Sequence, residues 1–338
     1  MSESARGRTG IVVLNWRNAP DTLECLTSLL RLDGAPFDLY VVDNASGDGS
    51  LERIREWCIE HVDPFLLREG RFAAAGAALH LAPRSPSRLP GVALLASDAN
   101  GGFSAGNNIG VRAALRDGCE YVWLLNNDVV VAPDALHALV SDAESQPRAG
   151  VLGACILEYF APDTVQCLGG VRFNWFLTTK RPVGAGLPAA QAAAHGEATY
   201  DYVMGAALFV PRRTFERVGL LAEDYFLYHE ELDLAQRCAA AGLQMRTVAR
   251  ARIWHKYGAS AGSSADIRRK STMSAYYGSR SAVLCTRRFR PALLPVVLAA
   301  RLARSAVLAA RGAGRLALAT LRGSVAGLFA PLAPPPRA

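Results

Sequence analysis

Acidic residues are missing from the last fifth of the chain, because none follows Asp266. Residues 267–338 carry 13 Lys and Arg, whereas residues 1–266 carry 24 basic and 30 acidic residues. The tail therefore has a net charge of +13 and the remainder a net charge of −6. Such a separation of charge favours an anionic partner surface, which we expect to be lipid headgroups, with no nucleic acid as partner.

Paired cysteines and an export signal are missing as well. The seven cysteines are scattered singly, with an odd total and no C-x-x-C pair, so they indicate neither a disulfide framework nor a zinc site. The first ten residues lead into the apolar run 11–14 without the hydrophobic region of a signal peptide. We therefore expect a chain that stays in the reducing cytosol.

No uninterrupted apolar run reaches the length of a membrane span. The longest, 291–300, is about half of the roughly 20 residues required, and Arg301 and Arg304 interrupt its extension. Arginines recur in the tail at spacings that would gather them on one helical face, although two glycines weaken its continuity: Arg301, Arg304, Arg311, Arg315 and Arg322, with Gly312 and Gly314.

We expect residues 266–338 to form amphipathic helices that lie peripherally on the cytoplasmic face of the inner membrane. The alternative is that the tail packs its apolar side on the rest of the chain and leaves its arginines in solvent. The complete absence of acid favours the membrane.

The first part of the chain alternates short apolar runs with helix-like segments, which is typical of an α/β fold with a mostly parallel sheet. We expect strands at 11–14, 39–42, 92–97 and 121–125, and helices at 22–32, 50–58 and 109–116. Residues 68–90 have no clear period and are expected to be an inserted surface loop. Farther on, we expect helices at 133–144 and 231–242, strands at 151–157 and 204–211, and a loop over 171–194. Residues 1–265 would form one catalytic domain.

Polar residues follow four of the expected strands. Asn15, Asp43, Asn100 and the sequence Asn126-Asn127-Asp128 would meet at one edge of the sheet, where open parallel sheets bind ligands. A G-x-G-x-x-G turn is absent after the first strand, which argues against a nicotinamide cofactor. Asp43 could accept from the ring N–H of uracil or thymine, although a turn aspartate has the same appearance.

A glycine-rich segment, 100–110, opens a helix, and its backbone could approach a phosphate or ribose through Asn100, Gly101 and Asn107. Asp128 is the best candidate ligand for Mn²⁺ or Mg²⁺, because these ions prefer hard oxygen donors; the alternative is a polar turn.

Three carboxylates enter one expected helix, at Glu230, Glu231 and Asp233, where they could supply a general base or merely cap the helix. His255 is either a packed histidine or a further metal ligand.

Taken in order, these pieces resemble glycosyltransferase family 2 (GT2), which has the GT-A fold, and within it the bacterial rhamnosyltransferase-like branch. The resemblance covers roughly residues 10–260 and rests on seven stretches: IVVLNWRN, VVDNASGDGS, NGGFSAGNNIG, WLLNNDVVV, GAALFVPRR, FLYHEELDLAQR and IWHKYGAS. It implies a Rossmann-like sheet flanked by helices, to which the C-terminal amphipathic helices are appended.

The resemblance also implies roles for the candidate residues. Asp43 would contact the nucleobase, and Asn15 and Asn100 would lie beside the nucleotide. Asp128 would be the retained carboxylate of a D-x-D metal motif, in which this chain has Asn126 where many members have Asp, and His255 would be a second ligand.

The general base of the family falls on Glu231, with Glu230 and Asp233 as alternatives. We therefore expect an inverting transferase that moves a sugar from a uridine or thymidine diphosphate, with dTDP-rhamnose favoured, to a cell-envelope glycan or a lipid-linked acceptor. The alternatives are a sugar nucleotidyltransferase and a non-catalytic, membrane-attached nucleotide-binding protein.

Overall fold

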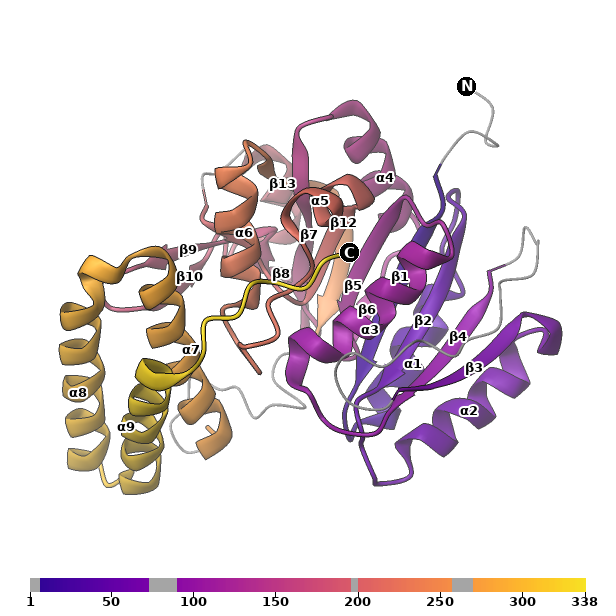
Figure 1. Cartoon of the computed structure of the whole chain (residues 1–338). Coiled ribbons are helices and arrows are strands. Elements are labelled where there is room, and N and C mark those ends of the chain that lie inside the picture. The colour runs from indigo at the N-terminus through magenta and orange to yellow at the C-terminus, as the bar shows by residue number, and fades with distance from the viewer. Residues whose placement is uncertain (1–6, 73–89, 196–199, 257–269) are drawn as a thin grey trace.

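A computed structural model describes residues 7–72, 90–195, 200–256 and 270–338. It has a central sheet covered by helices, with a group of C-terminal helices beside it, seen at the left of Figure 1. Helices α1, α2 and α4 cover one face of the sheet, and α3 and α5 cover the other. The expected α/β class with a mostly parallel sheet and a helical tail is confirmed. The helices are α1 (Ala19–Leu29), α2 (Ser50–His61), α3 (Gly102–Arg116), α4 (Ala135–Ser145), α5 (Arg212–Val218), α6 (Glu230–Ala240), α7 (Thr272–Phe289), α8 (Leu294–Ala310) and α9 (Gly314–Phe329).

The main sheet of the described residues has the strand order β3-β4-β2-β1-β5-β12-β7-β13-β6, with β8 paired to β7. Strands β3, β4, β2, β1 and β5 are parallel, so their carboxyl ends share one edge, and β12 runs against both of its neighbours. The strands are β1 (Thr9–Asn15), β2 (Phe37–Asp43), β3 (Leu67–Phe72), β4 (Val92–Ser97), β5 (Tyr121–Asn126), β6 (Val129–Val131), β7 (Ala149–Glu158), β8 (Ala161–Leu168), β12 (Ala207–Pro211) and β13 (Gln244–His255).

The expected loop at 68–90 is wrong over its first residues, because β3 spans Leu67–Phe72 and pairs with β4 at the edge of the sheet. Edge strands tolerate charged side chains, which removes the apolar pattern by which a strand is recognised. Arg68 is an example, since its guanidinium is buried and lies 2.7 Å from Asp117. Residues 73–89 of that expected loop lie outside the described residues.

The expected loop at 171–194 is also wrong. Strands β9 (Gly170–Asn174) and β10 (Thr179–Pro182) form a hairpin, and β11 (Tyr202–Val203) pairs with β9 in a separate small sheet. Thr178, with φ +51°, lies in the turn of the hairpin. Such short strands carry too few residues for an alternating pattern to stand out from a loop.

The tail forms three helices, of which α9 packs against both α7 and α8. The helical stretch Pro291–Ala310 has 20 residues and contains a window with a mean hydropathy of 1.7, so among the described residues it is long and apolar enough to cross a membrane by length and composition alone. That the tail lies peripherally on a membrane stays a prediction, but another expectation about it is wrong. The arginines do not share one face, because α8 and α9 are separate helices joined through Gly312 at φ +75°, and Arg301 is only 7% exposed.

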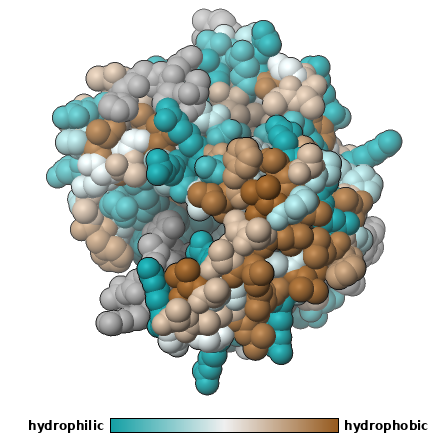
Figure 2. All heavy atoms as spheres, turned by 90° about the vertical axis from the view of Figure 1, so that its left-hand side faces the viewer, coloured by the Kyte–Doolittle hydropathy of each residue, from teal (hydrophilic) through white to brown (hydrophobic). Residues whose placement is uncertain are grey.

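An apolar surface remains exposed on α8 and α9, although the tail is folded. Figure 2 faces this side of the molecule and shows hydrophobic side chains gathered over it. We call this surface the apolar face; its large exposed members are Val296, Leu302, Val307, Leu318, Leu321, Val325 and Phe329.

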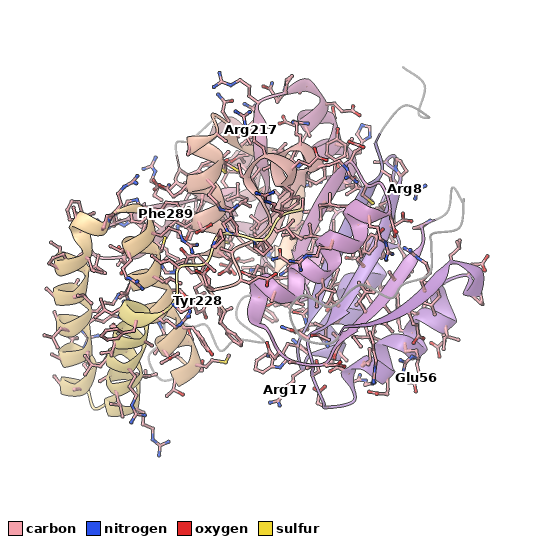
Figure 3. The ribbon with its side chains drawn as sticks, viewed as in Figure 1. Arg8, Arg17, Glu56, Arg217, Tyr228 and Phe289 are labelled. Atoms are coloured by element: carbon pink, nitrogen blue, oxygen red, sulfur yellow. The ribbon has the colours of Figure 1, made fainter. Side chains whose placement is uncertain are left out.

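Helix α7 joins the tail to the catalytic part of the chain. Tyr228, labelled in Figure 3 between the tail helices and the sheet, has its hydroxyl 3.0 Å from Ser274 Oγ of α7. Ser281 donates to Leu227 O at 2.8 Å, and Arg280 donates to Asp224 O at 2.6 Å. The alternative of a tail docked on the rest of the chain thus describes α7 well, whereas membrane binding and a domain boundary at 265/266 stay predictions.

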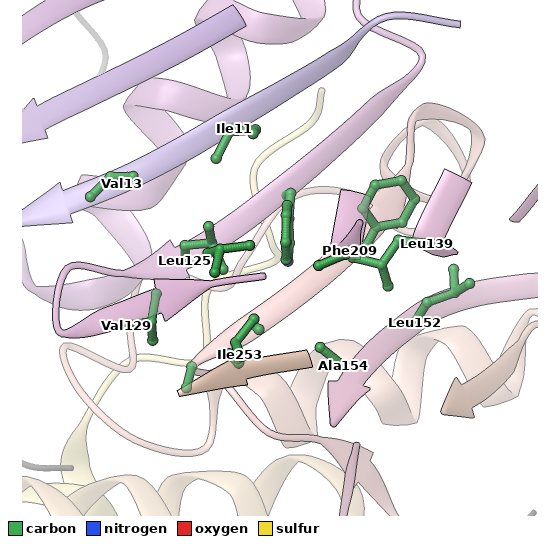
Figure 4. Close-up of a cluster of buried hydrophobic side chains, with 14 of the residues drawn as sticks. Ile11, Val13, Leu125, Val129, Leu139, Leu152, Ala154, Phe209 and Ile253 are labelled. Carbon is green, nitrogen blue, oxygen red and sulfur yellow. The ribbon is translucent and has the colours of Figure 1, made fainter. Parts of the chain in front are cut away.

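The largest hydrophobic cluster lies between the sheet and one helical layer, as Figure 4 shows for Ile11, Val13, Leu125, Phe209 and Ile253. These side chains come from β1, β5, β12 and β13. Because parallel strands covered by helices are buried on both faces, they appear in the sequence as continuous apolar runs, which is why β1, β2, β4 and β5 could be predicted.

Candidate active site

Asn15 connects the ends of three elements at the carboxyl edge of the sheet. Its side chain is fully buried, donates to Asp43 Oδ1 at 2.7 Å and accepts from Thr22 Oγ1 at 2.7 Å. Asp43 also accepts from the backbone N–H of Ser46 at 3.1 Å and from its hydroxyl at 2.5 Å. The structure thus brings Asn15 and Asp43 together, with Asn15 holding the carboxylate rather than facing the cavity.

The glycine-rich segment is fixed to the end of β2 by Asn44. Asn44 Nδ2 donates to Asn100 Oδ1 at 3.0 Å, and Asn44 Oδ1 accepts from the N–H of Gly101 at 3.3 Å. Gly102 has φ +83°, and a Cβ there would lie 2.1 Å from Phe226 O, so the position requires glycine. The segment therefore approaches the chain that leads into α6.

Asn107, the last of the expected nucleotide contacts, is not at the cavity. It is 1% exposed and its amide donates to Phe103 O within α3 at 2.9 Å. Because α3 begins at Gly102, several residues before the expected 109, Asn107 lies in the second turn of the helix and faces inward. Asn100 and Gly102, by contrast, line the cavity.

Asp128 and His255, the two expected metal ligands, meet although 126 residues separate them in the chain. Pairing of β13 with β6 brings Nε2 of His255 to 3.2 Å from Oδ1 of Asp128, and both side chains are about 95% buried. Gln166 Oε1 lies 2.7 Å from Nδ1 of His255, while the amide of Gln166 donates to Glu158 at 3.1 Å. Because the amide thus faces Glu158, Nδ1 carries the hydrogen and the Nε2 lone pair points at Asp128.

These two side chains fit a divalent cation. Neighbouring ligands of an octahedral ion with bonds of about 2.1 Å are about 3.0 Å apart, close to the observed separation. Within the described ranges, no third Asp, Glu, His or Cys joins them, so further oxygens would have to come from a ligand such as a diphosphate. Asn126 lines the cavity beside them, whereas Asn127 is buried and donates to Thr22 Oγ1 at 2.9 Å.

Helix α6 begins at Glu230 after two residues with left-handed backbone, Tyr228 at φ +67° and His229 at φ +74°. Such conformations cost about 1–3 kcal/mol each and cluster at functional sites. Here they direct the first turn of α6 toward the cavity, which both glutamates line.

Glu230 and Glu231 have different surroundings. Burial, followed by the charge of Glu231, raises the pKa of the Glu230 carboxyl well above its ordinary value. Glu231 lies 3.9 Å from the Lys180 ammonium of β10, a cation that suits a carboxylate partner. The arrangement therefore favours the neutral form of Glu230, whereas Glu231 has a cation beside it.

Asp233, the third expected carboxylate, is fully buried and absent from the cavity wall. Its two oxygens accept from Arg237 at 2.6 Å and from Arg288 of α7 at 2.7 Å. Saturated in this way, it anchors α6 to the tail and has no lone pair directed at the cavity.

A cavity of about 640 Å³ joins these groups. Its wall includes Trp16 and Asn100 at the strand ends, Asp128 and His255 at the expected metal site, and Glu231 on α6. The tail closes the remaining side with residues of α7, α8 and α9. Of the expected site residues, this one space is lined by Asn100, Asp128, Glu230, Glu231 and His255. It is not lined by Asn15, Asp43, Gly101, Asn107 or Asp233.

Several residues in the cavity wall, and Gln166 behind His255, gave no usable pattern in the sequence. Gln166 and Lys180 lie in strands whose short polar sequences resemble loops. His229 lies in a motif from which only the three carboxylates were proposed as site residues. Arg301 was expected on a solvated or lipid-facing helical face but is buried in the cavity wall. Only the contacts between distant elements identify these side chains.

Comparison with known proteins agrees with the resemblance that the sequence motifs indicated. The model of glycosyl transferase family 2 matches residues 10–165. A low-salt glycan biosynthesis hexosyltransferase of Haloferax volcanii is 24% identical over 232 residues, which make up 67% of this chain and 60% of that protein. An N-acetylglucosaminyl-diphospho-decaprenol L-rhamnosyltransferase of Mycobacterium tuberculosis is 29% identical over 279 residues, or 72% of this chain and 75% of that protein.

Solved structures share the fold. A mannosyltransferase of Pyrobaculum calidifontis, in complex with GDP-mannose and Mn²⁺, has a TM-score of 0.56 at 17% identity over 97% of this chain and 89% of its own. GalNAc-T7 with UDP, GalNAc and Mn²⁺ has the same TM-score at 12% identity, over 83% of this chain and 51% of its own. The expected GT-A fold is therefore confirmed. The family model and both relatives thus agree that the chain is similar to glycosyl transferase family 2, with residues 10–165 matching the family model itself.

Proposed function

We propose that the chain is an inverting, metal-dependent glycosyltransferase that moves rhamnose from dTDP-rhamnose to a hydroxyl of a lipid-linked cell-envelope glycan. The observation that carries this proposal is the single cavity that holds the Asp128–His255 pair and the Glu230–Glu231 pair. A donor diphosphate at the first pair and an acceptor hydroxyl at the second would place the two reactants side by side.

Asp128 and His255 would hold Mn²⁺ or Mg²⁺, which supplies positive charge to the leaving nucleotide diphosphate. Gln166 keeps His255 in the tautomer that presents Nε2. Asp43, fixed by Asn15 and Ser46, would contact the thymine or uracil edge, and Asn100 and Gly102 would border the rest of the nucleotide.

Glu231 would act as the general base and take the proton of the acceptor hydroxyl as its oxygen attacks the anomeric carbon. Glu230 is less suited to this role because burial and the charge of Glu231 raise its pKa well above the ordinary value, and its protonated form can donate a hydrogen bond within the site. Lys180 positions the Glu231 carboxylate at 3.9 Å, and Gly205 leaves room beside it, since a Cβ there would lie 3.3 Å from Glu231 Oε1. Direct attack inverts the anomeric centre without a covalent intermediate.

The choice of donor sugar and acceptor follows from the family resemblance and from the mycobacterial relative, whose name specifies rhamnose transfer to a diphospholipid. The apolar face of α8 and α9 and the lack of acid after Asp266 support peripheral binding to an anionic membrane, on its cytoplasmic side.

The proposal is tested by incubating the purified full chain with Mn²⁺, a GlcNAc-diphosphopolyprenol acceptor and dTDP-rhamnose, UDP-glucose or GDP-mannose. Product formation from dTDP-rhamnose alone supports the proposed donor and acceptor. Product formation from another donor would keep the proposed transferase activity but replace rhamnose with another sugar. If the chain binds nucleotide in a Mn²⁺-dependent manner but all donors remain intact, the proposed transfer reaction is wrong.

A further inference from the structure

Four basic side chains face the part of the cavity that the tail closes: Lys180 of β10, Lys270 just before α7, and Arg301 and Arg304 of α8. Lys180 lies more than 120 residues before Arg301 and Arg304 in the chain. The acids in the wall of the same cavity are Asp128, Glu230 and Glu231. Glu231 faces Lys180, and Asp128 faces His255. With these two carboxylates paired, Glu230 is the remaining acid of the cavity wall opposite Lys270, Arg301 and Arg304.

Arg301 is the most informative of the four. Its side chain is more than nine-tenths buried, yet its guanidinium makes one long hydrogen bond, from Nη2 to Thr178 O at 3.4 Å, and its buried Nε has no acceptor. Burial, followed by the charge of Arg304, lowers the pKa of Arg301 to about 10. Proteins rarely bury a guanidinium without an anionic partner, because desolvation is not offset.

Lys270 and His229 line the same part of the cavity. Burial lowers the pKa of Lys270, and the charges of Arg304, Arg301 and Lys180 lower it further. His229 is 3% exposed in the cavity wall, and neither ring nitrogen has a hydrogen-bond partner. Among the described residues, Arg301 Nε and the ring nitrogens of His229 therefore have no hydrogen-bond partner, and they line one space together with Lys270 and Arg304.

We propose that Lys270, Arg301 and Arg304 bind the phosphate or diphosphate group of the acceptor substrate. Guanidinium and ammonium groups in this arrangement match phosphate oxygens, which accept several charge-assisted hydrogen bonds at once. The inference rests on the proposed function and extends it, because it assigns the acceptor a phosphate-bearing headgroup and a binding site.

The placement of the cluster favours the acceptor over the donor. The donor residues lie at the carboxyl ends of β1, β2 and β5, whereas Arg301 and Arg304 lie on α8, at the left of Figure 1 and away from these strands. Glu231 lines the same cavity, 3.9 Å from Lys180 of the hairpin. Leu302 and Val307 of the apolar face lie on the same helix as Arg301, so a hydrocarbon chain attached to the phosphate could continue along that face.

The test is calorimetric titration of the full chain with farnesyl diphosphate in EDTA, which removes divalent metal from the Asp128–His255 site. We expect wild type to bind, and Arg301→Gln and Lys270→Gln each to weaken binding about tenfold or more. Arg311→Gln, an exposed arginine at the end of α8, is the matched control and should change the affinity less than twofold. Lys270→Gln keeps the test meaningful if Arg301→Gln folds poorly.

Three further ligands distinguish the sources of the phosphate. Farnesol should not bind, and dTDP with Mn²⁺ should bind all four proteins equally. Inorganic pyrophosphate that binds as tightly as farnesyl diphosphate would identify a site for free diphosphate and overturn the lipid assignment. If the substitutions instead weaken dTDP and spare farnesyl diphosphate, the cluster serves the donor and the proposal is wrong. These binding measurements do not require transferase activity. A wild-type chain that transfers no sugar would therefore contradict the proposed function without contradicting the phosphate site.

Discussion

Arg288 of α7 donates to Asp233 of α6 at 2.7 Å, which ties the C-terminal tail to the helix that carries Glu231. A second nitrogen of Arg288 donates to Asp224 at 2.6 Å. Helix α7 is therefore packed firmly against the segment that includes α6. A deletion that begins at residue 282 would remove Arg288 and the buried Leu284 and Cys285, so it would test folding rather than membrane binding.

We expect Arg288→Met to lower the free energy of unfolding by about 3 kcal/mol, because it leaves the buried Asp224 and Asp233 carboxylates with less compensating charge. Transferase activity should fall with it, since α6 loses an anchor. Arg217→Met, an exposed arginine on α5, is the control and should change stability by less than about 0.5 kcal/mol. Chemical denaturation measures both; equal stability of the two variants would contradict the anchoring role.

Removing either candidate metal ligand should abolish the Mn²⁺-dependent part of nucleotide binding. We expect Asp128→Asn and His255→Ala to bind dTDP equally with Mn²⁺ and with EDTA, as measured by calorimetry. Gln166→Leu should reduce Mn²⁺ affinity about 10- to 100-fold, because His255 loses the hydrogen bond that orients it. Asp134→Asn, at an exposed carboxylate before α4, should behave as wild type. Retained Mn²⁺ dependence in Asp128→Asn would place the metal elsewhere.

The two glutamates of α6 should differ in their effect on catalysis. Glu231→Gln should lower kcat about 10²- to 10⁴-fold while leaving nucleotide affinity unchanged, because only the proton acceptor is lost. Glu230→Gln puts an amide of similar shape in place of a carboxyl whose pKa is raised well above its ordinary value, so its kcat should stay within about tenfold of wild type. A larger loss in Glu230→Gln than in Glu231→Gln would exchange the two roles.

Stability should depend on pH through Glu230. Its pKa is raised in the folded chain, by burial and then by Glu231, so above its ordinary value of 4.5 the unfolded chain releases a proton that the folded chain keeps. The contribution of Glu230 to the free energy of unfolding therefore falls as pH rises, by up to about 1.4 kcal/mol per unit, until the folded group ionises. Glu230→Gln should gain stability relative to wild type between pH 5 and 7 in denaturant titrations. A constant difference across that range would show that Glu230 is charged.

Membrane binding should depend on the apolar face. We expect the double variant Leu302→Gln, Phe329→Gln to lose most of its co-sedimentation with anionic phospholipid vesicles, because these apolar side chains are 62% and 81% exposed on the apolar face. Phe160→Gln removes an equally exposed aromatic, 82% accessible between β7 and β8, and should bind vesicles as wild type does. If both variants lose co-sedimentation equally, or if neither does, the apolar face is not the surface that binds the membrane.

Much of the site could be predicted because its chemistry lies in short local motifs. Asp128 and Glu231 each lie in a short motif beside a recognisable strand or helix. The order of these motifs along the chain resembles that of the family, which assigned both residues to one site. The metal pair shows the limit, since the sequence proposed His255 as a ligand, but only the β13–β6 pairing gives its 3.2 Å approach to Asp128. Asp233 and Asn107 show the opposite case, because a residue of suitable chemistry can face away from the cavity.

By itself, the sequence determined the layered α/β fold, the polar strand ends and the charge asymmetry of the tail, because each depends on local apolar runs or on composition. Tertiary structure alone decided which basic residues are buried and what faces them. Arg301 belongs to an ordinary helical stretch in the sequence, yet packing against the β9–β10 hairpin places its guanidinium beside Thr178, 123 positions earlier. The physical reason is that desolvation and ion pairing depend on neighbours in space, which residues distant in the chain supply.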